Sequence, residues 1–371
     1  MPRLRIAHLT SAHPRGDVRV YHKMCRTLAA AGHEVSLIVA DGLGDDVMDG
    51  VRVFDAGAPA GRADRVMRAP RRIRDLATAL HPDICHLHDP ELLPAGLALK
   101  KAGFRVIFDS HEDVAKQIMS KHYLPRPLRR PAGVLWKEFV EDRICSQLDG
   151  VVAATPAIGE RFTDVARRLA VVRNYPLLTE FPRVATRTST GRVVCYLGAI
   201  STTRGLLELV DAVGLARGRP NLLLAGSCRE PGLLEIARGR PFWSQVQEFG
   251  SLDRVGVAQL LGRAAVGMVT LHPTPNHLES LPIKMFEYMA AGLPVIASDF
   301  PVWRDIVDRF QCGLLVDPLD SASIARAIDC LLDDPATAQA MGERGRRAIE
   351  TELNWESEAS VLSELYTTVC R

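Results

Sequence analysis

Apolar and polar positions alternate along the first half of the chain in a way that predicts strands followed by helices. Short apolar runs at 5–9, 35–40, 83–88, 104–109 and 151–154 are separated by amphipathic stretches at 18–31, 65–80, 91–101 and 128–148. The first amphipathic stretch stops at Gly32, a residue type that commonly ends a helix because it tolerates a left-handed backbone. Strands that alternate with helices of about 10–15 residues predict a parallel sheet with helices on both faces.

The same alternation starts again after residue 192. Residues 176–192 are rich in Pro, Thr and Arg, and we interpret them as a linker. Apolar runs follow at 193–197, 222–225, 266–271 and 294–298, with helical stretches at 204–213, 254–263 and 281–291. We therefore predict an α/β fold with two Rossmann-like, doubly wound parallel-sheet lobes that face a cleft. The first lobe takes residues 1–180 and the second takes 181–353, while the last helix, 354–371, packs back on the first lobe.

Composition is that of a globular protein with two domains. The chain has 371 residues, 47% of them hydrophobic and 24% charged, and domains usually run to roughly 100–200 residues. A net charge of +2 and an aromatic content of 6% disfavour a nucleic-acid binder. Residues 1–185 nevertheless carry a net charge of +6 and the remainder carries −4. This asymmetry either arises by chance or indicates an anionic partner for the first half.

Cysteine usage and the N-terminal segment bear on the cellular compartment. The eight cysteines are scattered and form no CxxC pair, which is typical of reduced, buried thiols in a cytoplasmic protein. No apolar run approaches the roughly 18–20 residues of a membrane span, and residues 4–9 are typical of a strand rather than a signal peptide. We expect a cytoplasmic protein that is either free or peripheral at the inner membrane surface.

Several common cofactor motifs are missing from the sequence. There is no GxxxxGK[ST] phosphate loop, and the nearest dinucleotide fingerprint, at 42–47, lacks its third glycine and carries acids that would repel a pyrophosphate. No DxD pair occurs, which disfavours a metal-held diphosphate site of that kind. His86 and His88 would share one face of a strand. A zinc site there is the alternative to a buried strand whose polar end lines the cleft.

The segment 277–299 carries the strongest chemical signal. Glu279 and Glu287 are eight residues apart, and a helix is predicted to begin between them, with Ser280 as its cap and Pro282 in its first turn. At 1.5 Å per residue the two acids would be about 12 Å apart. The unpaired backbone N–H groups of the first turn would lie between them and form an anion site. This length matches a nucleotide sugar, which has hydroxyls at both ends and a diphosphate between them.

Two cations accompany this segment. Lys284 would stand on the first turn of the helix, where it can meet a phosphate, and it is the only lysine among the 18 basic residues after position 185. Arg204 follows a strand that ends at Gly198, and a guanidinium at that point can hold a diphosphate through two parallel hydrogen bonds. The alternatives are an ordinary solvated helix start and a surface arginine.

The chain resembles the retaining GT-B glycosyltransferases of family 4, which use nucleotide sugars. The resemblance rests on the E-x7-E pattern with its LPIKMFEYMAAGLPVIASD context, and it extends to DVRV at 17–20, AGHEV at 31–35 and the terminal helix near Trp355. It implies that Glu279 contacts the transferred sugar and that Glu287 contacts the ribose. The expected donor-binding residues around the helix start are Ser280, Leu281, Pro282, Ile283 and Lys284.

One position of the family pattern lacks its usual positive charge in this chain. Ala199 stands where many members have an arginine, just after the glycine that Gly198 matches. Arg204 matches the family's second basic diphosphate ligand, which is usually lysine. One cation is therefore missing from the leaving group, and we expect Lys284 or a residue of the first lobe to compensate.

The resemblance also assigns residues outside these two segments. His111 matches the histidine at a strand end near the anomeric centre, with a capping or core histidine as the alternative. Gly16 lies in the first strand–helix loop, where donor and acceptor come close. Gly250, Ser251 and Leu252 follow a short strand and would offer backbone contacts to the base.

The expected activity is transfer of a hexose-type sugar from a nucleoside diphosphate sugar, with UDP favoured, to an acceptor hydroxyl in glycan, glycoconjugate or natural-product biosynthesis. His111, Glu279 and Arg204 are the expected catalytic residues, and no nucleophile is assigned. Fixed N–H groups and cations would stabilise the leaving diphosphate, so no cofactor and no essential metal are expected. The acceptor is either a lipid-linked glycan at a membrane surface or a soluble small molecule, and the basic patches at 62–74 and 121–137 would face it.

Two other functions fit the same sequence features. One is a nucleotide-sugar epimerase on the same two-lobe plan, which needs no acceptor. The other is a non-catalytic subunit that binds sugar nucleotides. A dehydrogenase is disfavoured by the missing glycine fingerprint.

Overall fold

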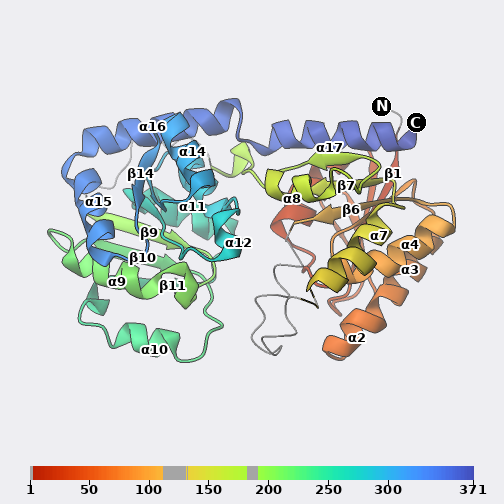
Figure 1. The fold of residues 1–371 in the computed structure, drawn as a ribbon, viewed down its shortest axis with the longest axis horizontal. Helices are drawn as coiled ribbons and strands as arrows, with labels where there is room; N and C mark the ends of the chain where they lie inside the picture. Colours follow the sequence, from red (N-terminus) through yellow and green to blue (C-terminus); the bar gives the residue numbers. More distant parts are fainter. Residues whose placement is uncertain (1–2, 112–130, 132, 182–190) are drawn as a thin grey trace. The chain divides into compact units, whose positions relative to one another are not determined.

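The computed structural model describes residues 3–111, 131, 133–181 and 191–371 (Figure 1). The chain divides into two compact units, one of Met1–Asn174 with Glu356–Arg371 and the other of Tyr175–Trp355. Each unit is built on a mainly parallel sheet with helices on both faces. The predicted α/β class with two doubly wound lobes is confirmed.

The first unit holds an eight-stranded sheet in the order β3-β4-β2-β1-β5-β6-β7-β8, parallel except for the β3–β4 pair. Its strands are β1 (Arg5–Leu9), β2 (Glu34–Val39), β3 (Asp46–Met48), β4 (Val51–Asp55), β5 (Ile84–Leu87), β6 (Arg105–Ser110), β7 (Gly150–Ala153) and β8 (Leu169–Val171). The apolar pattern did not predict β3, β4 and β8. The first two carry charged residues within the strand, and β8 has only three residues.

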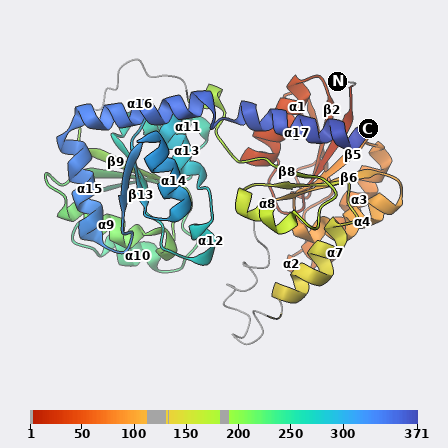
Figure 2. The same cartoon turned by 45° about the horizontal axis from the view of Figure 1, so that its top comes forward.

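Helices cover both faces of this first sheet. They are η1 (Val18–Cys25), α1 (Arg26–Ala30), α2 (Arg62–Met67), α3 (Ala69–Leu80), η2 (Pro90–Leu92), α4 (Leu93–Lys101), η3 (Trp136–Asp142), α7 (Arg143–Cys145), α8 (Pro156–Phe162) and α17 (Trp355–Cys370). The terminal helix α17 lies along this unit (Figures 1 and 2), and its buried Tyr366 bonds His86 of β5 at 2.6 Å. Most of the basic patch predicted at 121–137 lies outside the described residues.

The second unit holds a six-stranded parallel sheet in the order β11-β10-β9-β12-β13-β14. Its strands are β9 (Val193–Leu197), β10 (Asn221–Ala225), β11 (Val246–Gly250), β12 (Val266–Val269), β13 (Val295–Ser298) and β14 (Gly313–Val316). Its helices are η4 (Leu178–Glu180), η5 (Thr202–Arg204), α9 (Leu206–Leu215), α10 (Leu233–Arg238), η6 (Trp243–Gln245), α11 (Arg254–Arg263), α12 (Pro275–Leu278), α13 (Ile283–Ala290), α14 (Pro301–Phe310), α15 (Ser321–Asp333) and α16 (Pro335–Thr351).

Two apolar cores enclose the second sheet. Helices α9, α10 and α15 supply one core, and α11, α13 and α14 supply the other. Trp303 of α14 and Tyr288 of α13 are fully buried, and burial of one such apolar side chain stabilises a fold by roughly 2–3 kcal/mol. Tyr288 also accepts a hydrogen bond from the backbone N–H of Leu197 at 2.8 Å. Helix α13 is thereby fixed against the carboxyl end of β9.

Strand order locates the place where each unit can bind a ligand. In doubly wound sheets, ligands bind at the carboxyl ends of the strands, where the strand order reverses. The second unit reverses between β9 and β12, and the first unit reverses between β1 and β5. The loops that follow these four strands are therefore the candidate site loops. Within the described part of the chain, no helix is both long enough and apolar enough to span a bilayer.

Candidate active site

Helix α13 begins at the carboxyl edge of the second sheet. It starts at Ile283 with Pro282 as its N-cap, and no side chain bonds its first turn among the described residues. Ser280 was predicted as the cap, and this is wrong: its Oγ donates to the carbonyl of His277 at 3.1 Å, and its carbonyl accepts from Trp303 Nε1 at 2.7 Å. These bonds hold the preceding turn in place. The Met285 amide bonds the Pro282 carbonyl at 3.0 Å, and the amides of Ile283 and Lys284 stay available to an anion.

Lys284 is the most unusual side chain of this edge. It is 6% exposed, and its Nζ lies 3.5 Å from the centroid of the Tyr196 ring. This Nζ has no hydrogen-bond partner among the described residues. Burial, together with the Arg204 guanidinium, holds the pKa of Lys284 well below its usual range. An amine that has lost water without gaining a partner costs free energy, and a bound anion would remove that cost.

The loop after β9 packs directly on the loop after β12. Gly198 has φ of +101°, and a Cβ built on it would lie 3.6 Å from Lys284 Nζ. Gly205 has φ of +73°, and a Cβ there would lie 2.1 Å from the Thr270 carbonyl oxygen. Both positions therefore require glycine. Arg204 stands between them as the last residue of η5.

Lys284 and Arg204 lie close enough for the Arg204 charge to lower the pKa of Lys284. Tyr196 lies under Lys284, and burial raises the pKa of its hydroxyl to about 12 although Arg204 acts in the opposite direction. Burial lowers the pKa of His277, and the charges of Arg204 and Lys284 lower it further. The nearby acid Glu208 is already paired with His272 at 3.1 Å. This arrangement favours an anionic ligand.

The two glutamates of the E-x7-E pattern have different surroundings. Glu279 follows α12 and is exposed. Glu287 lies on the second turn of α13, two residues nearer the helix start than predicted, and is 7% exposed. Its Oε1 accepts a hydrogen bond from Arg254 Nη1 at 2.7 Å. The sequence reasoning missed Arg254, which begins α11 behind the capping residue Asp253.

The residues predicted to contact a base lie at the same edge of the sheet. Gly250 ends β11 with φ of +64°, and its carbonyl accepts from the N–H of Gly226 at 2.7 Å. Ser251 is exposed, and Leu252 packs partly buried against the core. The structure therefore brings the residues predicted for the second lobe to the carboxyl edge of one sheet. These are Gly198, Arg204, Gly250, Ser251, Leu252, Glu279, Ser280, Leu281, Pro282, Ile283, Lys284 and Glu287.

Gly16 and His111 belong to the first unit, at its own switch point. Gly16 lies in the loop between β1 and η1, with open space where a Cβ would stand. His111 follows β6, and its Nε2 lies 3.1 Å from Nε2 of His13. His13 also bonds Asp17 at 3.1 Å and lies 3.3 Å from Asp89. The sequence reasoning missed His13 and Asp89, because the ends of β1 and β5 meet only in the folded sheet.

His13 is a cation in this arrangement. Burial alone would lower its pKa, but the hydrogen bond to Asp17 and the charge of Asp89 raise it to about 9. The pKa of Asp17 falls to about 2, because its bond to His13 and the N–H groups of Val20 and Arg19 outweigh burial. Both nitrogens of a protonated imidazole donate. The Nε2–H of His13 can therefore donate to Nε2 of His111, 3.1 Å away, or to Asp89 Oδ1, 3.3 Å away.

Three histidines cluster where a shared strand face was predicted on β5. They are His8, His86 and His88. His8 of β1 pairs in register with His86, and His88 donates or accepts at 2.8 Å with His8. Ligand atoms of the three lie within 4.8 Å of one another, as a metal site requires. However, several ring nitrogens of the cluster are already in hydrogen bonds: Nδ1 of His8 with Nε2 of His88 at 2.8 Å, and Nδ1 of His86 with the Tyr366 hydroxyl at 2.6 Å. The geometry fits a buried stack of hydrogen-bonded, neutral imidazoles better than a zinc site.

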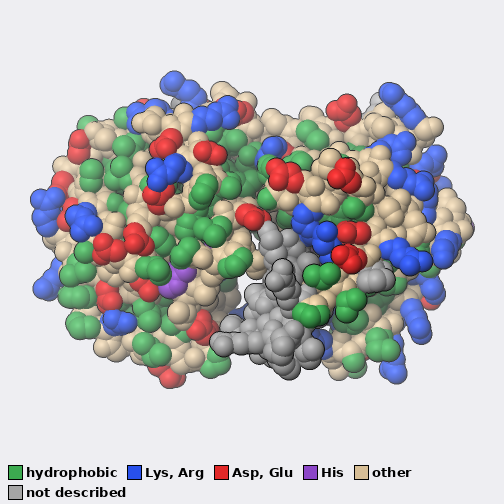
Figure 3. Space-filling view, in the orientation of Figure 1, with side chains coloured by type: hydrophobic (Ala, Val, Ile, Leu, Met, Phe, Trp, Pro, Cys, Tyr) green, Lys and Arg blue, Asp and Glu red, His purple; other side chains and the backbone are tan. Residues whose placement is uncertain are grey.

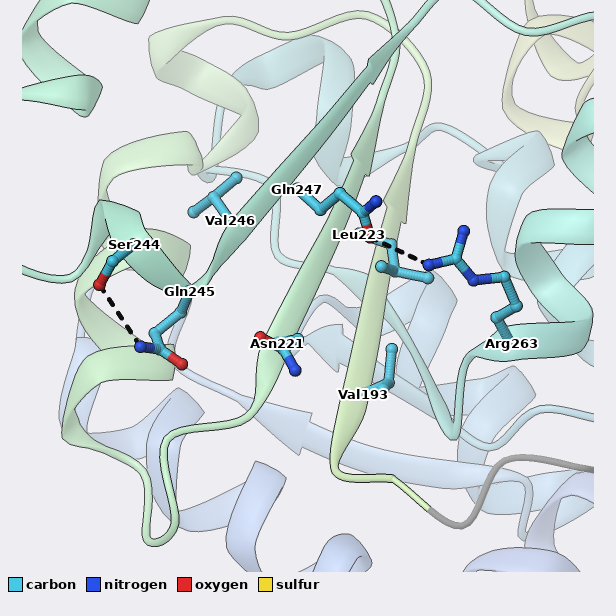
Figure 4. A pocket seen from close by; sticks show the side chains of 8 residues that line it. All are labelled: Val193, Asn221, Leu223, Ser244, Gln245, Val246, Gln247 and Arg263. Carbon is cyan, nitrogen blue, oxygen red and sulfur yellow. Dashed lines mark hydrogen bonds between the residues drawn. The ribbon is translucent and has the colours of Figure 1, made fainter.

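A cavity of about 310 Å³ opens at the other end of the second sheet (Figure 4). Val193, Asn221 and Val246, which line it, are the first residues of β9, β10 and β11. Arg263 bonds Gln247 at its wall. The cavity therefore lies at the amino ends of the strands, away from the loops described above.

Two family models match the chain, one for each unit. "Glycosyl transferase 4-like domain" matches residues 16–175, and "Glycosyl transferases group 1" matches residues 179–348. The chain belongs to the GT4-like glycosyltransferases. The matched ranges of this glycosyltransferase include every predicted site residue from Gly16 to Glu287. The resemblance drawn from the E-x7-E segment is confirmed, and so is the prediction of an enzyme.

One curated relative and two solved structures match nearly the whole chain. Glycogen synthase of Mycobacterium tuberculosis is 24% identical to this glycosyltransferase, over 95% of this chain and 91% of that protein. Sucrose-phosphate synthase from Thermosynechococcus elongatus superposes with a TM-score of 0.82 at 21% identity, over 99% of both chains. HepE of Anabaena in complex with UDP-glucose gives 0.73 at 15% identity, over 99% of this chain and 100% of that one. The fold is GT-B.

Proposed function

We propose that this glycosyltransferase moves a hexose-type sugar, with retention of anomeric configuration, from a nucleoside diphosphate sugar to an acceptor hydroxyl. UDP is the favoured nucleotide. The observation that carries the proposal is the buried Lys284 amine, which stands beside Gly198 and Arg204 at the start of α13 without a hydrogen-bond partner among the described residues. A structural neighbour, HepE, is described in complex with UDP-glucose, which supports the choice of UDP.

The chemistry follows from where negative charge develops. Separation of the anomeric carbon from the diphosphate leaves charge on the phosphate oxygens. Arg204, Lys284 and the first-turn N–H groups of α13 are fixed in position, so they stabilise that charge without reorganisation. Lys284 supplies the positive charge that is missing at position 199, where Ala199 stands in place of the family's arginine. We propose that no metal ion is essential. Treatment with EDTA should leave most activity, whereas loss restored by a divalent ion would contradict this.

Three further residues have proposed roles at the two ends of the donor. Glu287 holds the ribose hydroxyls through the carboxylate that Arg254 orients, and Glu279 contacts the transferred sugar. His111 contacts the sugar near the anomeric carbon, and His13 lies beside it, with the two Nε2 atoms 3.1 Å apart. The backbone of Gly250, Ser251 and Leu252 contacts the base.

The donor is identified by screening. A panel of UDP-, GDP- and dTDP-sugars is tested by thermal shift, and the best ligand is then incubated with candidate acceptors. A UDP-sugar should give the largest shift, and product should form only when an acceptor is present. Conversion of the donor sugar without an acceptor would support an epimerase, and donor binding without product from any acceptor would support a binding subunit.

The surface of helix α2 in the first unit bears on the identity of the acceptor. No residue of α2 is buried, and Val66 and Met67 are 49% and 68% exposed. Arg62, Arg68 and Arg71 line a cavity of about 460 Å³ at this helix, and Figure 3 shows Lys and Arg side chains with hydrophobic ones over this edge.

Apolar and basic side chains on one surface favour an anionic membrane. We propose a lipid-linked acceptor. Sedimentation with phosphatidylglycerol vesicles should fall when Arg68 and Arg71 are changed to glutamate. No sedimentation with the wild type would favour a soluble acceptor.

A further inference from the structure

Arg254 connects three parts of the second unit that are far apart in sequence. Its Nη1 donates to Glu287 Oε1 at 2.7 Å, and its Nη2 bonds Glu180 Oε2. Its guanidinium carbon lies 5.4 Å from the centroid of the Phe181 ring. Arg254 also directly follows the segment Gly250–Asp253. One planar group therefore joins the loop at the end of β11, the α13 carboxylate and the segment that enters this unit.

This arrangement is more constrained than a surface ion pair. The Arg254 side chain is 25% exposed, and those of Glu180 and Glu287 are 14% and 9% exposed. Ion pairs on an open surface contribute little, but removal of one partner from a buried pair leaves the other charge uncompensated. The Asp253 carboxylate caps α11 through the N–H of Gly256 at 2.8 Å, which fixes the backbone from which Arg254 projects.

We propose that Arg254 is a positioning residue that sets ribose recognition by Glu287, with Glu180 as its second anchor. This inference rests on the proposed function. Because Arg254 occupies Oε1 of Glu287, it fixes the carboxylate plane and directs Oε2 to the donor. A carboxylate held at one oxygen can accept from a ribose hydroxyl without first losing side-chain freedom. Arg254 itself need not touch the donor.

The proposal predicts a change in selectivity rather than only a loss of affinity. A carboxylate that binds the 2′-hydroxyl discriminates against a 2′-deoxyribose, because a charged acceptor loses its donor. With Arg254 intact, the 2′-deoxynucleotide should bind at least about tenfold more weakly than the ribonucleotide. Without Arg254, Glu287 is free to turn away from the ribose. The ratio of the two dissociation constants should then approach one.

The experiment compares UDP with 2′-deoxy-UDP by calorimetry on the full chain. Arg254→Met should weaken UDP binding about tenfold and change 2′-deoxy-UDP binding much less. Arg254→Lys keeps the charge but loses the two-pronged geometry, so its ratio should be intermediate. Glu180→Gln, which leaves Arg254 in place without its second anchor, should lower the ratio two- to fivefold.

Arg263→Met is the matched control, because Arg263 lies at the other end of α11. It also stands 5.2 Å from an aromatic centroid, that of Phe249, and bonds Gln247 at 3.0 Å. Its substitution should leave the ratio unchanged. If Arg254→Met fails to fold, the Lys and Gln variants carry the test.

Two results overturn the proposal. In the first, Arg254→Met and Glu180→Gln keep the same ratio of dissociation constants as the unmodified protein. In the second, Arg263→Met lowers that ratio as much as Arg254→Met does. Two other results overturn the ribose role of Glu287 itself. One is that the unmodified protein binds UDP and 2′-deoxy-UDP equally well, and the other is that Glu287→Gln binds both nucleotides as the unmodified protein does. Either outcome refutes the donor site and the inference together, and it differs from the result in which only Arg254 is dispensable.

Discussion

Replacement of Lys284 by methionine should change the stability of the ligand-free protein little and should weaken donor binding strongly. Methionine has a similar length and no charge, and its sulfur can pack on the Tyr196 ring. In the ligand-free protein, the substitution removes a buried amine that has no hydrogen-bond partner among the described residues. The amine lies 3.5 Å from the centroid of the Tyr196 ring.

Two opposing contributions to the free energy of unfolding decide the stability of the ligand-free variant. An unsatisfied buried polar group costs about 1–3 kcal/mol, and the cation–π contact, which is made only while Lys284 is charged, contributed about 0.5–2 kcal/mol. The substitution should therefore change the free energy of unfolding to a value between about 1 kcal/mol lower and about 2.5 kcal/mol higher. The donor complex loses charge-assisted hydrogen bonds of about 1.5–3 kcal/mol. Donor affinity should then fall roughly 10- to 150-fold.

Thermal unfolding and calorimetry with UDP measure the two effects. Lys23→Met is the matched control, because Lys23 is also buried but donates to the Asn174 carbonyl at 3.0 Å and to its Oδ1 at 2.5 Å. That variant should unfold more easily and bind UDP normally. A Lys284→Met protein that is strongly destabilised, or that binds UDP with wild-type affinity, would refute the reasoning.

Proton uptake gives a second readout at Lys284. Burial holds its folded pKa well below that of the unfolded chain, which is about 10.4. The unfolded state therefore holds more protons, and the free energy of unfolding rises with pH between the two values. A bound diphosphate should restore the charge. At a pH between the ligand-free and donor-bound pKa values of Lys284, donor binding should take up a proton in the wild type and not in Lys284→Met, as buffers of different ionisation enthalpy would reveal.

The remaining predictions concern both units. Arg204→Ala should lower turnover more than donor affinity, and equal losses would indicate ground-state binding only. Glu287→Ala should weaken donor binding at least about tenfold in calorimetry, and unchanged affinity would count against its ribose role. Gly205→Ala should lower the melting temperature, because φ is +73° and a backbone oxygen lies 2.1 Å from the new Cβ. A wild-type melting curve would be inconsistent with that packing. The pKa of His13, raised to about 9, makes its stabilising contribution full below about pH 6.5 and lost as pH rises through 9. His13→Gln should flatten this pH dependence in denaturant titrations between pH 6 and 10, and an unchanged slope would contradict the assignment.

Local sequence signals predicted the fold and part of the site. The apolar runs located most of the strands, and the 277–299 segment placed Lys284 on the first turn of a helix. Both features depend on neighbours along the chain. Ser280 shows the limit of such signals: it has the residue type of a cap, but its hydroxyl bonds His277 and its carbonyl bonds Trp303 of α14. A competing bond within the preceding turn took the hydroxyl, and the helix began at Ile283.

The missed residues all act across sequence distance. Arg254 meets Glu287 from 33 positions upstream, and Asp89 meets His13 from a different strand. No periodicity relates such partners, because the order of strands in the sheet brings them together. The same order, with its reversal between β9 and β12, placed the loops of Gly198 and Lys284 against each other.

A crystal structure of the protein with UDP tests the central claim most directly. The account predicts a phosphate oxygen within hydrogen-bond distance, about 2.7–3.2 Å, of Lys284 Nζ, with Arg204 on the same diphosphate and the ribose at Glu287. UDP bound in the cavity lined by Val193, Asn221 and Gln247, with Lys284 still lying on the Tyr196 ring and unchanged, would contradict it.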